Sequence, residues 1–197
     1  MAMKRFPLEQ FATVELNQVA FPKTGMVVSQ TPLGEKFVEG EGNYGVCENG
    51  MWVSADKSKG YIDAPAAETD MIGVVYTAEK EYDMYHYGLK TFGRKKAGDY
   101  PRVGILGLGD TITSNCFQYD DSEFAATSGD DAKTSDEVLF DALDAIDEVP
   151  LYVKPVIGSP IAQITKTAPA TGVYAKVVKF YTVPNGEKGI KYQVVHL

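Results

Sequence analysis

Histidine and cysteine are the residue types best suited to acid–base or nucleophilic chemistry at neutral pH, and this chain has two of each. His86 lies in the tyrosine-rich segment 81–87, and His196 is the next-to-last residue. One interpretation makes His86 a general base for Cys47 or a serine; the other, which we favour, makes it a hydrogen-bonded residue of an aromatic strand. The sequence contains no Gly-x-Ser-x-Gly motif, no His-Glu-x-x-His motif and no zinc-type spacing. It therefore predicts no catalytic residue, no metal ligand and no cofactor, and a chain that is not an enzyme.

The two cysteines, Cys47 and Cys116, match no metal-binding or redox motif in their spacing. Nothing else in the sequence indicates an oxidising compartment, and 197 residues are enough to build a sizeable core without a covalent cross-link. We expect two buried free thiols, with a single disulfide as the alternative.

The glycine-rich segment 104–109 invites comparison with a nucleotide-binding loop. Its glycines do not follow the order Gly-x-Gly-x-x-Gly, and residues 110–113 continue as a strand rather than a helix. Without a helix N-terminus, a phosphate group lacks the converging N–H groups that bind it. The segment therefore predicts a tight turn between strands.

Acidic residues are concentrated between Tyr119 and Glu148, where eleven carboxylates and one lysine give a net charge of −10. Because the whole chain carries −8, the remainder sums to +2 (−8 + 10). Charge confined to one acidic block suits a phosphate backbone poorly, so we expect no nucleic-acid partner. The clusters 120–123 and 129–131 offer oxygen ligands for calcium but lack the EF-hand pattern. We expect the block to face solvent, with a bound cation or a basic partner as alternatives.

Short alternating stretches separated by glycine and proline predict a mainly β protein whose antiparallel hairpins form a sandwich or barrel. Asn49-Gly50 is the strongest turn signal among them. The predicted hairpins pair 177–183 with 190–195, 46–48 with 51–54, and 102–106 with 111–116. Two more strands are expected over 71–76 and 152–157, the second at a sheet edge because Pro155 has no N–H to donate.

One segment shows helical periodicity. Thr134 and Glu137 have capping-box spacing, and Pro150 ends the pattern. The apolar residues between them at helical intervals are Val138, Leu139, Ala142, Leu143 and Ile146. We therefore predict one short acidic helix within an insertion at about 119–149.

The first 34 residues show no sustained period, and three prolines interrupt them. We predict an extended N-terminal arm over 1–34 and a single mainly β domain over 35–197 that carries the acidic insertion. Apolar arm residues such as Phe6 and Val14 are costly to leave in water. We expect the arm to dock on a neighbouring subunit, with packing on its own domain as the alternative.

The composition, 44% hydrophobic and 23% charged, is that of a globular chain. No stretch approaches the roughly 18 apolar residues of a membrane helix. Pro7 and Glu9 interrupt the position where a signal peptide has its apolar run. We expect a soluble protein with no membrane partner.

Five blocks spread along the chain are Leu16–Phe21, Glu48–Met51, Tyr100–Val103, Leu108–Asn115 and Lys179–Gly186. Together they resemble blocks in a group of small tailed-phage virion proteins, the head-associated proteins described as capsid decoration or cement proteins. Each block is a strand-and-turn pattern rather than a catalytic one, and the acidic insertion has no counterpart in that pattern.

The resemblance implies a non-enzymatic structural virion protein of a bacteriophage, without a cofactor, that binds the major capsid protein on the outer capsid surface and stabilises the shell. It implies a virion location after synthesis in the host cytoplasm. Twelve tyrosines also favour an interaction protein, and we expect self-association into a homo-oligomer. Two alternatives stay open: a tail or head–tail connector component, and a carbohydrate-binding β module that uses Tyr82, Tyr85 and Tyr87.

Overall fold

The computed structural model describes residues 2–8, 12–14, 27–28, 31–77, 95–129, 132–182 and 186–197. They form a seven-stranded sheet in the order β1-β7-β9-β8-β10-β11-β6 and a four-stranded sheet in the order β2-β5-β4-β3. The strands are β1 (Met3–Arg5), β2 (Val27–Val28), β3 (Trp52–Ser54), β4 (Ile72–Val75), β5 (Val103–Ile105), β6 (Thr111–Ser114), β7 (Phe117–Asp120), β8 (Tyr152–Val156), β9 (Ser159–Thr165), β10 (Tyr174–Thr182) and β11 (Lys188–His196). A short 3-10 helix, η2 (Lys57–Lys59), and one α-helix, α1 (Ser135–Asp144), complete the described elements.

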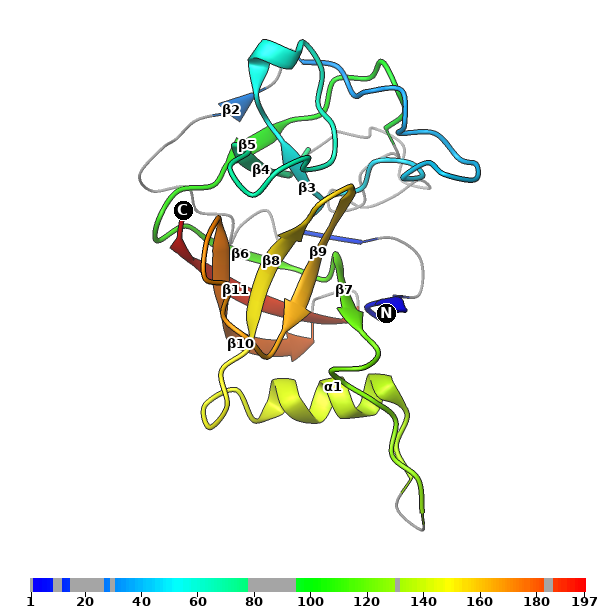
Figure 1. Ribbon diagram of the computed structural model, residues 1–197, viewed down its shortest axis with the longest axis vertical. Helices are drawn as coiled ribbons and strands as arrows, with labels where there is room; N and C mark the ends of the chain where they lie inside the picture. The colour runs from blue at the N-terminus through cyan, green and yellow to red at the C-terminus, as the bar shows by residue number, and fades with distance from the viewer. Residues whose placement is uncertain are drawn as a thin grey trace.

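The elements stack in three levels: the small sheet, the large sheet and then α1 at the far end (Figure 1). The predicted mainly β class is therefore confirmed, as packed sheets and not as a closed barrel in the part of the chain that the structure describes. Among the named strands the pairing is antiparallel except between β7 and β9, which run parallel.

The hairpin of β10 and β11 confirms the clearest prediction from the sequence. In β11, Ile190, Tyr192 and Val194 are buried on the inner face, as their alternation predicts. In β10 the register shifts between Val177 and Lys179, so the strict alternation expected for this strand breaks there. The tip of the hairpin, 183–185, lies outside the described residues.

Helix α1 forms because its first turn is capped as the sequence predicts. The Glu137 N–H donates to the Thr134 hydroxyl at 3.3 Å, and the Thr134 N–H donates to the Glu137 carboxylate at 2.7 Å. Leu139 and Leu143 are fully buried against the large sheet, which fixes the inward face of the helix. The predicted short acidic helix is confirmed.

A second core lies within and around the small sheet, with Phe37, Val53 and Val103 fully buried. The two sheets are joined through Trp52, whose indole N–H donates to the Tyr192 hydroxyl at 3.1 Å. Because both side chains are fully buried, this bond favours one arrangement of the two sheets.

Two of the predicted hairpins are wrong in their pairing. β3 follows the Asn49-Gly50 turn but pairs with β4 rather than with 46–48. The turn at 107–110 exists, yet it connects β5 of the small sheet to β6 of the large sheet, where β6 pairs with β11. In both cases a local turn signal is correct, while the partner strand is decided by packing elsewhere in the chain.

The strands predicted over 71–76 and 152–157 are present as β4 and β8, but β8 is not at an edge. It lies between β9 and β10 in the large sheet. β10 pairs with β8 at Tyr152 and Val153, and the register with β9 shifts between Lys154 and Val156. Pro155 therefore sits at an irregularity where no ladder bond from its nitrogen is needed.

The described part of the arm packs on its own chain, which corrects our expectation of docking elsewhere for these residues. β1 pairs with β7, and the Phe6 N–H donates to the Phe117 carbonyl at 2.9 Å. Phe6 and Val14 are both fully buried.

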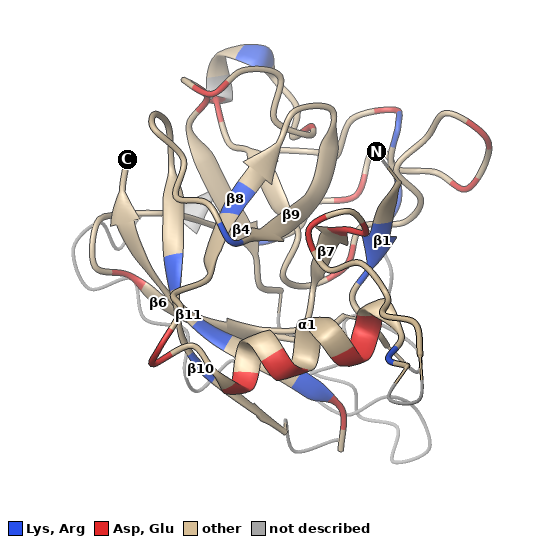
Figure 2. Cartoon of the chain, turned by 60° about the horizontal axis from the view of Figure 1, so that its bottom comes forward, with Lys and Arg blue, Asp and Glu red and all other residues tan. Residues whose placement is uncertain are grey.

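Part of the acidic block departs from our expectation that this segment faces solvent. Tyr119 and Phe124 are fully buried, and Asp120 is 4% exposed. The exposed acids lie mainly along α1 (Figure 2). No helix among the described residues is long and apolar enough to cross a membrane.

Candidate functional site

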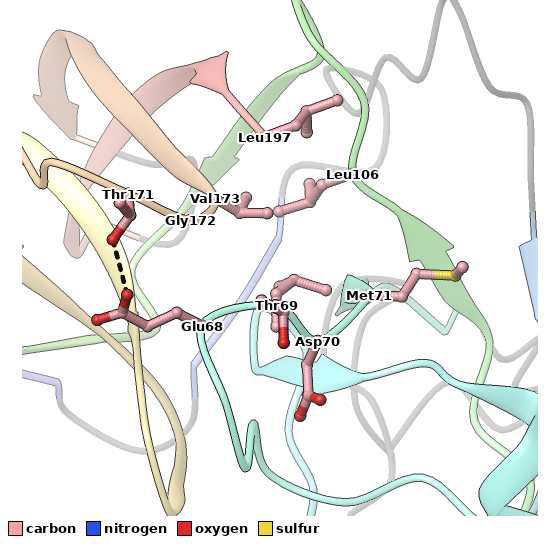
Figure 3. Close-up of a pocket in the computed structure, with 10 residues that line it drawn as sticks. Glu68, Thr69, Asp70, Met71, Leu106, Thr171, Gly172, Val173 and Leu197 are labelled. Atoms are coloured by element: carbon pink, nitrogen blue, oxygen red, sulfur yellow. Dashed lines mark hydrogen bonds between the residues drawn. The ribbon is translucent and has the colours of Figure 1, made fainter.

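The strongest candidate for a binding site is a pocket of about 630 Å³ where the two sheets meet (Figure 3). Four segments distant in the sequence line it: the turn and strand start at 68–72, Leu106 after β5, the approach to β10 at 171–173, and Leu197 after β11. Leu106 and Val173 point toward one another in the pocket. Its lining is mainly apolar, with a few polar groups, as is typical of binding pockets.

A hydrogen bond at the pocket connects the segment before β4 to the segment before β10. The Thr171 hydroxyl donates to the Glu68 carboxylate at 2.7 Å (Figure 3). Gly172 beside it has a φ of +76°, and a Cβ at this position would lie 3.1 Å from the Glu68 carbonyl oxygen. Glycine is thus required for the two segments to approach this closely.

Asp70 holds the turn at one side of the pocket. Its carboxylate accepts the N–H of Ala66 at 2.7 Å and of Ala67 at 3.3 Å, and it pairs with the Lys59 ammonium at 3.5 Å. Partial burial acts to raise the pKa of Asp70, but the donated N–H groups and the Lys59 charge together lower it below its ordinary value. The carboxylate is ionised at neutral pH and committed to the turn.

Two exposed apolar side chains line the pocket, and a third lies on a turn bonded to the end of β11. Met71 is 48% exposed and Leu197 is 57% exposed, and both line it. Leu108, 45% exposed, lies on a turn whose Gly109 N–H donates to the Val194 carbonyl at 2.8 Å, which places the turn beside the end of β11. We call Met71, Leu108 and Leu197 the apolar rim.

The pocket continues past the Glu68–Thr171 bond into a second hollow of about 270 Å³. The two hollows share Glu68 and 171–173, and the second reaches Lys154 and Pro155 of β8. Together they form one groove along the junction of the sheets, suited to bind an apolar surface with a polar margin.

The cysteines lie apart from this groove, and both are fully buried and free, as predicted. Burial raises the pKa of Cys47 well above its ordinary value. Burial also raises the pKa of Cys116 to about 12, against the opposing effect of the nearby Arg5 guanidinium. Because the thiolate is the nucleophile, these protonated thiols are unreactive at neutral pH.

A partly buried ion pair beside Cys116 was not predicted from the sequence. Arg5 donates to the Glu48 carboxylate at 2.7 Å, and its Nη2 lies 3.8 Å from the Cys116 sulfur. Glu48 also accepts the Ala12 N–H at 3.3 Å, so the pair ties the arm to the domain. The two charges come from segments 43 positions apart, and no local pattern connects them.

The candidate calcium ligands do not converge where the structure describes them. Asp120 accepts the N–H and hydroxyl of Ser122 at 2.9 and 2.8 Å, and these bonds lower its pKa. Glu123 accepts the Thr165 hydroxyl at 3.0 Å and the Lys166 N–H at 2.9 Å. In the described ranges no group of three or more His, Cys, Asp or Glu side chains could hold a metal ion. Asp130 and Asp131 lie outside those ranges.

Of the two histidines, His196 lies within the described residues. His196 stacks on Tyr174 with ring centroids 5.2 Å apart, and its Nδ1–H donates to the Gly172 carbonyl at 2.8 Å. This contact fixes the residue before Leu197 at the end of the pocket. His86 lies outside the described residues, as do Tyr82, Tyr85 and Tyr87.

Fold and pocket together define a mainly β chain of two packed sheets with an apolar groove at their junction. Comparison with known protein families, with curated proteins and with solved structures finds no match for the chain. The groove and the charges around it are therefore the features of this chain that bear on its function.

Proposed function

We propose that the chain is a non-enzymatic structural virion protein that binds the outer surface of a phage capsid through the apolar rim and stabilises the shell. The observation that carries this proposal is the exposure of Met71 and Leu197, two large apolar side chains that line one pocket, together with Leu108 on the turn bonded to the end of β11. Exposed apolar side chains gathered at a hollow are typical of protein interaction sites. The block resemblance supplies the kind of partner, the major capsid protein.

The distribution of charge supports one orientation on the shell. The exposed carboxylates of α1 lie at the end of the molecule opposite the small sheet (Figures 1 and 2). A protein bound through the apolar rim leaves these charges outside its contact with the shell, so they cost nothing in desolvation at that contact.

Two hydrogen bonds connect the elements on either side of the groove, which favours binding. The Trp52–Tyr192 and Thr171–Glu68 hydrogen bonds both connect the small-sheet lobe to the large sheet. A surface that is already ordered loses little conformational entropy on association. A cement protein stabilises the shell through the free energy of binding, and a preordered surface loses less of that free energy on association.

Mass spectrometry of purified virions tests the proposal directly. A decoration protein is expected at a copy number comparable with that of the major capsid protein. A copy number matching a single ring indicates a tail or head–tail connector component instead, and absence from virions refutes the proposal.

The apolar rim gives a more local prediction. The double variant Leu108→Asp, Leu197→Asp is expected to bind shells at least tenfold more weakly, about 1.4 kcal/mol, because two carboxylates replace apolar contacts. Both positions are exposed, so the fold should be unchanged. Co-sedimentation with shells that lack the protein measures the binding.

The matched control for the rim is Tyr100→Asp, since Tyr100 is 59% exposed but belongs neither to the pocket lining nor to the apolar rim. It should bind shells as the unmodified chain does. Equal binding by the double variant and the control would show that the contact lies elsewhere.

One observation favours carbohydrate binding as a second candidate function. A separate pocket of about 440 Å³ is lined by Tyr61, which is 45% exposed, together with Glu35, Lys36 and Asp63. An exposed aromatic ring beside hydrogen-bonding side chains is suited to a sugar, whose ring has an apolar face and a polar edge. A glycan array tests this: binding that is lost in Tyr61→Ala and kept in Tyr100→Ala supports the candidate, and no binding refutes it.

A further inference from the structure

The outward face of the β10–β11 hairpin carries a group of lysines. Lys179 and Lys191 are directly opposite each other in the register, and Lys176 lies one pair further along, opposite Gln193. Residues paired across antiparallel strands share a face, so these ammonium groups lie side by side. Like charges in such a pair destabilise a sheet unless an anion balances them.

Within the described residues, these lysines have no acidic partner. The ion pairs there involve Lys4, Arg5, Lys59 and Lys133. Two apolar side chains lie on the same face, Val178 at 50% exposure and Val195 at 40%. We call Lys176, Lys179, Lys191, Val178 and Val195 the lysine face.

A surface of complementary character lies at the C-terminal end of α1. Asp144, Asp147 and Glu148 are exposed there, and Val149 among them is 56% exposed. The last turn of α1 has no basic residue, so the carboxylates are unfavourably placed near the negative end of the helix dipole. No described residue forms an ion pair with them. We call these four residues the acidic tip.

The two surfaces cannot meet within one chain. Phe140 of α1 stacks on Phe180 of β10 with ring centroids 5.6 Å apart, and Phe180 is paired with the buried Ile190. The helix therefore packs on the inner face of the hairpin, whereas Lys179 and Lys191 point from the outer face.

We propose that the acidic tip of one copy of this chain docks on the lysine face of another. Three carboxylates then meet three ammonium groups, and Val149 meets the exposed valines of the hairpin. Each surface supplies the charge that the other lacks. Because the two surfaces differ, the contact is head-to-tail and extends into rings or rows of copies.

The contact is expected to be weak in free solution. A helix end covers less area than the roughly 1,200–2,000 Å² of a stable interface, and exposed ion pairs contribute little individually. We expect dissociation constants in the micromolar range or above, and a strong dependence on salt, since the Debye length falls from about 10 Å at 0.1 M to about 3 Å at 1 M.

Charge reversal on each side provides the test. The face variant is Lys176→Glu, Lys179→Glu, Lys191→Glu; the tip variant is Asp144→Lys, Asp147→Lys, Glu148→Lys. Sedimentation velocity over a concentration series measures the association of each purified chain. The unmodified chain should self-associate at low salt and dissociate at high salt, and each variant alone should associate at least tenfold more weakly.

Mixing the two variants should restore association, because the acidic face of one then meets the basic tip of the other. The matched control is Glu35→Lys, Glu41→Lys, which reverses exposed acids away from both surfaces and should associate as the unmodified chain does. Circular dichroism melting verifies that the variants fold. A monomeric unmodified chain, variants that keep their association, or a mixture that stays monomeric would each overturn the proposal.

This test uses the purified chain alone, without shells. Its outcome is therefore separate from that of the capsid-binding proposal: either could fail while the other stands.

Discussion

Phe6→Ala is expected to lower the free energy of unfolding by about 3–5 kcal/mol, the usual cost of removing a fully buried phenylalanine ring. Phe6 is 0% exposed and packs edge-on against Phe117 and Phe140, with ring centroids 6.3 and 5.7 Å away. It thus contacts both the large sheet and α1. Truncating it leaves a cavity at the point where the arm, the sheet and the helix meet.

Urea denaturation, monitored by the fluorescence of Trp52, measures this loss. The matched control is Met3→Ala in the same arm, where the side chain is 40% exposed, and it should change the stability by less than about 0.5 kcal/mol. A Phe6→Ala variant as stable as the unmodified chain would mean that the arm is not part of the core and is free to dock elsewhere.

Features that depend on neighbouring residues could be predicted from the sequence. The capping box of α1 involves Thr134 and Glu137, three positions apart, and both of its hydrogen bonds are present. The alternation of β11 is equally local, and its inward residues are the expected ones. In both cases the residues that form the pattern are close together in the sequence, and so are the residues that form the structure. Tertiary packing therefore did not change the outcome.

Strand partners were not predictable in the same way. Asn49-Gly50 marks a real turn, but β3 finds its partner β4 some twenty positions later because Trp52 and Val74 both bury their side chains in the core between the sheets. The missing N–H of Pro155 by itself predicts an edge strand, although a local irregularity in an inner strand accommodates this proline as well.

The groove could not have been found from the sequence for a related reason. Its defining hydrogen bond joins Glu68 to Thr171, 103 positions apart, and the rim residues are ordinary apolar side chains with no motif. A catalytic or metal site would carry residue types that stand out, whereas an apolar contact surface consists of the same residues as a core. The distinction lies in their exposure, which is a property of the fold.

Gly50→Ala is expected to cost roughly 2–5 kcal/mol, from strain in the left-handed region together with overpacking. Gly50 has a φ of +89°, and a Cβ there would overlap the Ser114 hydroxyl and lie 2.6 Å from the Cys116 Cβ. The Gly50 N–H donates to the Val75 carbonyl at 2.8 Å, which fixes the turn against the small sheet. The backbone at residue 50 therefore cannot shift away from Ser114 and Cys116 to make space for a Cβ.

Gly50→Asn distinguishes a buried turn from an exposed one. In an exposed hairpin, asparagine tolerates the left-handed conformation well and should cost little. In the structure the turn is buried, so asparagine meets the same close contacts as alanine and should be at least as destabilising.

Gly42→Ala is the matched control: its φ is +78°, but nothing lies within 4 Å of a Cβ, so only the strain of about 1–2 kcal/mol applies. Chemical denaturation of the three variants compares them, and a Gly50→Asn chain as stable as the unmodified one would place this turn on the surface rather than between β4 and Ser114.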